Sequence, residues 1–120
     1  IGRGKNSVTG LHDPTAHAEV LAIRDACRYL GHHQLDECLV YSSCEPCPMC
    51  MGALYWARPK AIYFAATRED AAEAGFDDSF IYDELSKPYD YRSIRANRLE
   101  ISNKKQPFIA WLNDQDRREY

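Results

Sequence analysis

The order of apolar segments along the 120-residue chain predicts an α/β fold. Two short apolar runs rich in strand-forming residues, Cys38–Tyr41 and Ala61–Ala65, each have the length of one buried strand. Met49–Ala57, between them, has helical character, and a longer amphipathic segment precedes the first run. Strand, helix and strand in this order predict a βαβ unit with two parallel strands.

The first helix is expected over Pro14–Leu30. Asp13 is a favourable N-cap residue, and Pro14 suits the first helical position because its missing N–H costs nothing there. Gly31 is a typical residue beyond a helix end. Between these signals, apolar residues recur at helical spacing, at Val20, Ile23, Cys27 and Leu30.

The rest of the chain gives weaker signals. Proline residues at 46 and 48 mark the entry of the second helix, and Pro59 lies just beyond its end. The polar segment Lys87–Arg98 is expected to be solvated surface. Two helical turns, an edge strand and a terminal helix are expected, in this order, at Asp70–Ala74, Asp78–Leu85, Leu99–Ser102 and Pro107–Arg118.

The composition indicates a single domain, residues 1–120, that acts on a small molecule. A chain of 120 residues with 45% hydrophobic residues can bury one core. Its net charge of -3 provides no basic field to attract nucleic acid. No apolar run approaches the roughly 18 residues that span a bilayer, and no secretory leader is visible. We therefore expect a cytoplasmic protein without a nucleic-acid or membrane partner.

The five cysteines favour metal binding over disulfide bonds. Their number is odd, and three of them lie within residues 44–50, which is unlike the framework of a secreted protein. The chain also opens at Ile1 without an initiator methionine. We therefore expect its domain to be incomplete at the N-terminus.

Two motifs, His17–Glu19 and Pro46–Cys50, lie at predicted helix starts and together indicate a zinc site. Helices in parallel α/β folds begin near the carboxyl ends of strands, so the two motifs can meet. Cys47 and Cys50 are three residues apart, which places both sulfur atoms on one helical face, and His17 supplies a third ligand. Three protein ligands leave the fourth tetrahedral position of one zinc ion to water, as in catalytic sites.

Glu19 is the predicted general base. It follows His17 by two residues and is the carboxylate placed beside the expected water. Because zinc lowers the pKa of a bound water to about 7, a carboxylate can accept its proton and deliver it to a ring nitrogen and then to a leaving amine. The His-x-Glu and Pro-Cys-x-x-Cys pair is the signature of zinc-dependent hydrolytic deaminases.

Other interpretations of the cysteines remain open. The Cys-x-x-Cys pair alone would fit a redox motif, which needs neither the histidine nor the glutamate. An iron–sulfur run would need a cysteine at the position of Leu54. Cys44 would complete a closed structural zinc site. However, Glu45 precedes a proline and is thereby disfavoured in helical geometry, so Cys44 is expected on the approach loop.

At these motifs the sequence resembles the cytidine deaminase-like superfamily of zinc-dependent deaminases. Asp13–Glu19 and Ser43–Cys50 carry this resemblance, and tRNA adenosine deaminases share both segments. Later residues look like bacterial guanine deaminases instead. With Asn6, this second similarity covers nearly the whole chain, through Trp56–Arg58, Asp70–Tyr82 and Arg117–Tyr120.

The resemblance implies a fold and an activity. The fold is a three-layer α/β/α sandwich of the cytidine deaminase-like type, from which this chain lacks the N-terminal helix and first strands. The activity is conversion of guanine to xanthine and ammonia with one zinc ion per subunit. The family forms homodimers, and the resemblance implies that residues from about 103 to 120 are exchanged between subunits and help to seal the partner's site.

The resemblance also implies four substrate-binding residues. They are Asn6, the main-chain N–H of Ala18, Asp78 and Tyr120. A carboxylate can accept hydrogen bonds from the ring N–H and exocyclic amine of guanine, and adenine lacks that donor pair. Asp77 has the same chemistry as Asp78, and only the alignment separates them.

Two alternative functions are distinguishable. Deamination of adenosine in tRNA needs a basic channel and a pocket for a flipped nucleotide, which the acidic composition and Asp78 disfavour. A zinc-stabilised structural domain without catalysis would not need Glu19.

Overall fold

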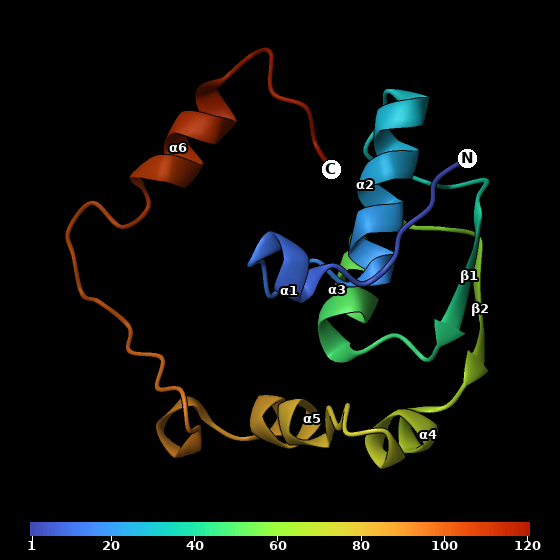
Figure 1. Cartoon of the computed structure of the whole chain (residues 1–120). Helices are drawn as coiled ribbons and strands as arrows, with labels where there is room; N and C mark the ends of the chain where they lie inside the picture. The colour runs from blue at the N-terminus through green and yellow to red at the C-terminus, as the bar shows by residue number, and fades with distance from the viewer. The chain divides into compact units, whose positions relative to one another are not determined.

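The computed structural model describes the whole chain, Ile1–Tyr120. It divides into two compact units, Ile1–Tyr82 and Asp83–Tyr120, which are described separately. Figure 1 labels the main elements of both units. In chain order they are α1 (Val8–Leu11), α2 (Ala18–Leu30), β1 (Leu39–Cys44), α3 (Pro48–Ala57), β2 (Ala61–Ala66), α4 (Arg68–Glu73), α5 (Ser79–Ser86), the 3-10 helix Tyr89–Tyr91 and α6 (Gln106–Asn113).

The strands β1 and β2 form a parallel pair, as the strand-helix-strand pattern predicts. Leu39 lies opposite Ala61 and Cys44 lies opposite Ala66. Figure 1 shows the two arrows side by side, pointing the same way, with α3 in the connection between them. The carboxyl ends of both strands therefore lie at one edge, and the chain leaves that edge directly into the cysteine motif. The α/β class is confirmed.

The predicted start of the first helix is wrong by four residues. The helix α2 begins at Ala18, and His17, not Asp13, is its N-cap residue. The Asp13 carboxylate instead accepts hydrogen bonds from the backbone N–H and the hydroxyl of Thr15, at 2.8 and 2.7 Å. These local bonds hold a turn before the helix, because a short carboxylate competes for nearby backbone donors. The helix ends at Leu30 before Gly31, as expected.

The predicted edge strand Leu99–Ser102 is absent, and the terminal helix is shorter than predicted. Residues 102–105 form a turn that leads into α6. The helix ends at Asn113 instead of residue 118, and Asp114 follows with an extended ψ of 112°. The Asp114 carboxylate accepts from the Asp116 N–H at 2.9 Å, so it forms its own turn and ends the helix.

The core of the first unit lies between α2, α3 and the segment before β1. Ala26, Leu35 and Ala57 form its buried cluster, and Cys27 and Cys38 pack against it. Leu54 and Cys50, both on α3, are only 1% and 0% exposed. The third residue of α3 is thus fixed in position by the core.

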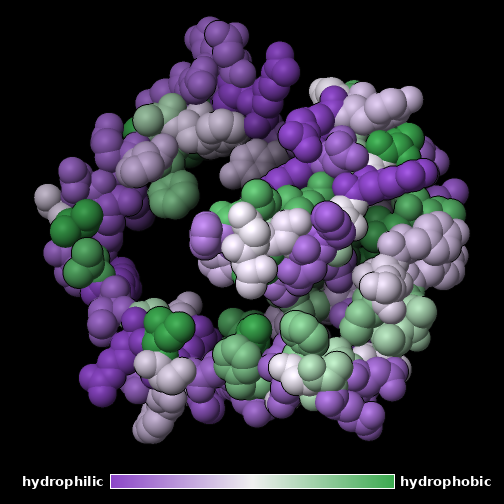
Figure 2. Space-filling model, viewed as in Figure 1, coloured by the Kyte–Doolittle hydropathy of each residue, from purple (hydrophilic) through white to green (hydrophobic).

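Large apolar side chains remain exposed on both units. On the sheet, Tyr41 and Tyr63 stack with ring centroids 5.2 Å apart, and both are more than half exposed. Figure 2 shows pale and green side chains at the surface over this strand pair. On α6, Phe108 and Leu112 are 70% and 64% exposed. No helix of the chain combines the length and the apolar character needed to cross a membrane.

The segment before α1 lies very close to α2. A Cβ atom added to Gly4 would stand 2.0 Å from the carbonyl oxygen of Ala18 and 2.6 Å from the backbone nitrogen of Ala22. The Arg3 N–H also donates to the Asp25 carboxylate on α2 at 3.0 Å. Because glycine lacks a Cβ, the chain can approach the start of α2 closely and deliver Asn6 beside it.

We expect Gly4→Ala to lower the free energy of unfolding by at least about 1–3 kcal/mol, since the backbone atoms it meets cannot move aside. Gly10→Ala is the matched control. It lies in α1 with no atom within 4 Å of an added Cβ, and alanine favours a helix. Urea denaturation of both variants measures the difference. Equal midpoints for the two variants would contradict the close approach.

Candidate metal centre and pocket

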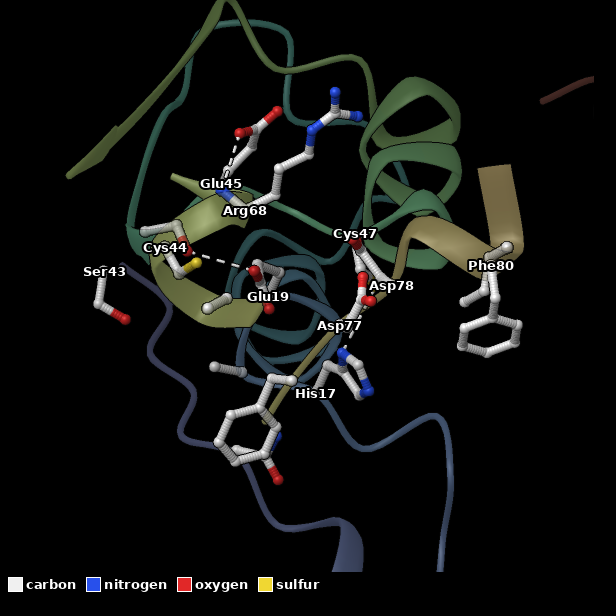
Figure 3. A pocket seen from close by; sticks show the side chains of 16 residues that line it. His17, Glu19, Ser43, Cys44, Glu45, Cys47, Arg68, Asp77, Asp78 and Phe80 are labelled. Atoms are coloured by element: carbon white, nitrogen blue, oxygen red, sulfur yellow. Dashed lines mark hydrogen bonds between the residues drawn. The ribbon is translucent and has the colours of Figure 1, made fainter. Parts of the chain in front are cut away.

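The two sequence motifs meet at the first residues of two helices. His17 is the N-cap residue of α2, and Cys47 is the N-cap residue of α3. Neither side chain forms a capping hydrogen bond with its own helix. The two side chains approach each other, as Figure 3 shows.

Three ligand atoms converge here. His17, Cys47 and Cys50 each offer one nitrogen or sulfur atom, and all three atoms lie within 4.8 Å of one another. The Nδ1 atom of His17 and the Sγ atom of Cys47 are 3.6 Å apart. Two ligands at about 2.1 and 2.3 Å from one zinc ion are about 3.6 Å apart in a tetrahedron. The donor atoms and their spacing thus fit zinc.

The two thiols have very different proton affinities. The hydrogen bond with Cys50 lowers the pKa of Cys47 to about 6, and nearby backbone N–H groups and His17 act in the same direction. The same hydrogen bond raises the pKa of Cys50, and burial and the negative Glu19 raise it further. Cys47 is thus ready to bind as a thiolate, and a positive ion would favour the thiolate of Cys50 as well.

Cys44 is not part of this group. Its thiol points to the carbonyl oxygen of Thr67 at 3.6 Å, and burial raises its pKa, which keeps it protonated. Cys27 and Cys38 pack against the core cluster of the first unit. The structure thus brings together three ligand atoms and neither a fourth thiolate nor an iron–sulfur set.

Glu19 is the second residue of α2 and adjoins the ligand group. Its Oε2 atom accepts a hydrogen bond from the Cys50 thiol at 3.4 Å. Its Oε1 atom accepts one from the Ser42 hydroxyl on β1 at 3.2 Å. The carboxylate is therefore held between β1 and α3, with one oxygen beside a candidate ligand.

A pocket of about 500 Å³ opens over this group, within the first unit. Its volume is typical of sites for small molecules. Most of the predicted site residues line it, whereas Cys50 is buried beneath. The lining includes Asn6, His17, Ala18, Glu19, Cys47, Asp77 and Asp78, together with apolar Phe76, Phe80 and Ile81.

The two adjacent aspartates differ in their surroundings. Asp77 is exposed, and its Oδ1 atom accepts from the Ser79 N–H at 2.9 Å, which lowers its pKa. It therefore fixes the turn into α5. Asp78 is half-buried and lines the same pocket, without such a bond. The geometry thus separates the two carboxylates, which the sequence pattern alone could not.

Asn6 lies in the first unit and lines the pocket, whereas Tyr120 belongs to the second unit. The Asn6 Oδ1 atom accepts from the Val8 N–H at 3.2 Å, which leaves the Nδ2 donor of this pocket residue for other partners. Tyr120 is the last residue of the second unit, so its role at a substrate stays a prediction.

A second set of contacts connects the cysteine motif to α4. The Glu45 carboxylate accepts from the Arg68 N–H at 3.1 Å, and the Glu45 N–H donates to the Ala66 carbonyl at 2.8 Å. Figure 3 shows the first of these bonds. Thr67 caps α4 through Asp70 in a reciprocal capping box. The segment that leads from β2 through α4 to Asp78 is thus hydrogen-bonded to the loop that carries the cysteine motif.

The sequence interpretation missed Ser42, Glu45 and Arg68 as site residues. The apolar pattern predicts a strand that ends at Tyr41, whereas β1 extends to Cys44. The available signal was the position of Ser42 at the carboxyl end of a parallel strand, where α/β folds bind ligands.

Comparison with known proteins agrees with this geometry. Residues 1–66 match the family model described as the cytidine and deoxycytidylate deaminase zinc-binding region. The guanine deaminase of Bacillus subtilis (strain 168) is 58% identical over all 120 residues, which span 77% of that protein. The tRNA-specific adenosine deaminase of Aquifex aeolicus (strain VF5) is 48% identical over 66 residues, covering 55% of this chain and 44% of that protein.

Solved structures also match this chain. An X-ray structure of guanine deaminase from Bacillus subtilis superposes with a TM-score of 0.97 at 57% identity, covering 99% of this chain and 76% of that one. A protein solved in complex with 8-azaguanine reaches a TM-score of 0.61 at 35% identity, over 62% of this chain and 44% of that one. These matches confirm the cytidine deaminase-like fold. The chain belongs to the guanine deaminases, within the zinc-binding cytidine and deoxycytidylate deaminase family.

Proposed function

We propose that this chain catalyses the zinc-dependent hydrolytic deamination of guanine to xanthine and ammonia. The observation that carries the proposal is one pocket over three side chains that fit a zinc ion, with the Glu19 carboxylate beside them and a second, half-buried carboxylate, Asp78, in the lining. The similarity to a guanine deaminase over the full length of the chain supports the substrate.

His17, Cys47 and Cys50 would hold the zinc ion. When bound, zinc supplies a water whose pKa is lowered to about 7, and it stabilises negative charge on the attacking oxygen. His17 and Cys47 line the pocket, so a substrate bound in the pocket would lie beside the ligand group.

Glu19 would carry the proton. Its carboxylate accepts a proton from the attacking water as the new C–O bond forms at the ring carbon that bears the amine. It then donates this proton to a ring nitrogen. It next takes the remaining proton from the hydroxyl group now attached to the ring carbon and passes it to the amine, so that the carbonyl forms, the C–N bond breaks and ammonia leaves. The position of its Oε2 atom, 3.4 Å from the Cys50 sulfur, supports this role.

Asn6, Ala18 and Asp78 would select the purine. The Nδ2 donor of Asn6 suits acceptor atoms of a purine, because its Oδ1 atom is engaged with Val8. Ala18 is the first residue of α2, so its N–H group has no hydrogen-bond partner within the helix. Asp78 would accept from the ring N–H and exocyclic amine of guanine, a donor pair that adenine lacks.

The dimer is a further part of the proposal. We expect a cytoplasmic homodimer in which the C-terminal segment, residues 103 to 120, is exchanged and Tyr120 closes the partner's pocket. The exposed apolar side chains of α6 support this arrangement, because an eight-residue helix with Phe108 and Leu112 exposed is not stable alone. We expect no membrane or nucleic-acid partner.

Deamination of adenosine in tRNA is the less favoured alternative. The relatives named tRNA-specific adenosine deaminases match 55 to 63% of this chain. Four carboxylates line the pocket, namely those of Glu19, Glu45, Asp77 and Asp78, whereas Arg68 is its one arginine or lysine side chain. Such a surface repels a phosphate backbone.

Replacing any of the three ligands by alanine should abolish stoichiometric zinc binding, because two remaining ligands do not hold the ion tightly. Cys44→Ala is the matched control, since its sulfur lies outside the ligand group. Zinc content by atomic emission after desalting measures this, with one zinc per chain expected for the control. Zinc loss in Cys44→Ala would indicate a fourth ligand instead.

Glu19→Gln should reduce guanine turnover at least about 100-fold while zinc stays bound, because the amide cannot accept the proton. Glu37→Gln removes an exposed carboxylate that does not line the pocket and should leave turnover unchanged. Release of xanthine and ammonia measures the rate. Turnover at the wild-type rate in Glu19→Gln would remove the proposed base.

Asp78→Asn should lower kcat/KM for guanine about 10- to 100-fold, because an amide presents one acceptor and leaves a substrate donor unpaired. Asp77→Asn should affect guanine turnover less and instead weaken the turn into α5. Steady-state kinetics of the pair, with zinc content as a check on folding, gives the comparison. A larger loss in Asp77→Asn would reverse the assignment.

A further inference from the structure

Glu19 has two hydrogen-bond donors, and they come from different elements. The Ser42 hydroxyl on β1 donates to Oε1 at 3.2 Å, and the Cys50 thiol on α3 donates to Oε2 at 3.4 Å. Figure 3 shows a dashed hydrogen bond that ends at Glu19. Ser42 is itself half-buried and is fixed by its register opposite Phe64 on β2.

The two oxygens of Glu19 have different neighbours. Oε2 adjoins the ligand group, because it lies 3.4 Å from the sulfur of Cys50. Oε1 is bonded to the hydroxyl of Ser42, which is not one of the three candidate ligands.

We propose that Ser42 is a positioning residue that holds the Oε1 atom of Glu19, so that the Oε2 atom faces the reacting water. This inference rests on the proposed function, because it assigns separate tasks to the two oxygens of the proposed base. Oε1 is the anchored oxygen, and Oε2 is the oxygen that accepts and returns the proton.

The need for such an anchor follows from the side chain. Glutamate has three rotatable bonds, and a reacting group must be held within about 0.5 Å of its productive position. A misplacement of about 1 Å can cost about 100-fold in rate. The Ser42 hydroxyl supplies the constraint from a strand, which is more rigid than a loop. Ser43, the next residue, lines the pocket but donates no hydrogen bond to Glu19.

The test compares Ser42→Ala and Ser42→Thr in the zinc-loaded protein with guanine. We expect Ser42→Ala to lower kcat about 10- to 100-fold, with KM for guanine within about twofold of wild type and one zinc per chain. Ser42→Thr keeps the hydroxyl and suits a strand, so it should restore most of the rate. Thr9→Ala removes an exposed hydroxyl from α1 and is the control that should match wild type.

A second measurement does not depend on turnover. Crystals of zinc-loaded Ser42→Ala should show the Glu19 carboxylate rotated or in two conformations, whereas wild type shows one. Three outcomes would overturn the proposal. They are a wild-type kcat in Ser42→Ala, a lower kcat accompanied by an equal rise in KM and a loss of zinc, and a Glu19 carboxylate that does not move. Absence of guanine turnover in the wild-type protein would refute the proposed function instead, and the carboxylate position would still decide the role of Ser42.

Discussion

The close approach of two helix starts is the constraint on which the site depends. His17 and Cys47 are the N-cap residues of α2 and α3, and their ligand atoms are 3.6 Å apart. This contact requires both helices to begin at the same edge of the parallel strand pair. It also requires the core to hold the buried third residue of α3, Cys50, in position. A metal ion would stabilise the arrangement, because it neutralises thiolates that otherwise repel each other and Glu19.

The remaining pocket walls are attached to this centre by hydrogen bonds between backbone and side chains. The Glu45 carboxylate binds the first N–H of α4, and Asp77 forms the turn into α5. Asp78 follows that turn directly, so its position depends on the strand β2 and the cysteine loop together. The candidate zinc ligands and the predicted substrate-binding residue Asp78 are thus parts of one connected structure, although they are far apart in sequence.

The sequence predicts well what local chemistry decides. The candidate zinc ligands and Glu19 occupy fixed spacings at helix starts, and the structure brings them together as the motifs predict. The parallel strands follow from two apolar runs around one helix. The predicted start of α2 is wrong because the Asp13 carboxylate bonds to Thr15 rather than to a helix. The predicted edge strand Leu99–Ser102 is wrong because strand-forming residues also occur in turns and exposed segments.

Long-range contacts cannot be inferred from the sequence in the same way. The bond from Ser42 to Glu19 joins residues 23 positions apart and depends on the register of β1 against β2. The difference between Asp77 and Asp78 depends on the conformation of the turn into α5. Substrate selection therefore rests on tertiary geometry and on similarity to the guanine deaminases, whereas the zinc chemistry is visible in the motifs.

Ammonia release by the zinc-loaded protein from guanine, adenine, cytosine and a tRNA anticodon stem tests the account most directly. The account predicts release from guanine, with xanthine in equal amount, and little or none from the other three. Release from the tRNA stem alone, or from none of the four by a protein that holds one zinc per chain, would contradict it.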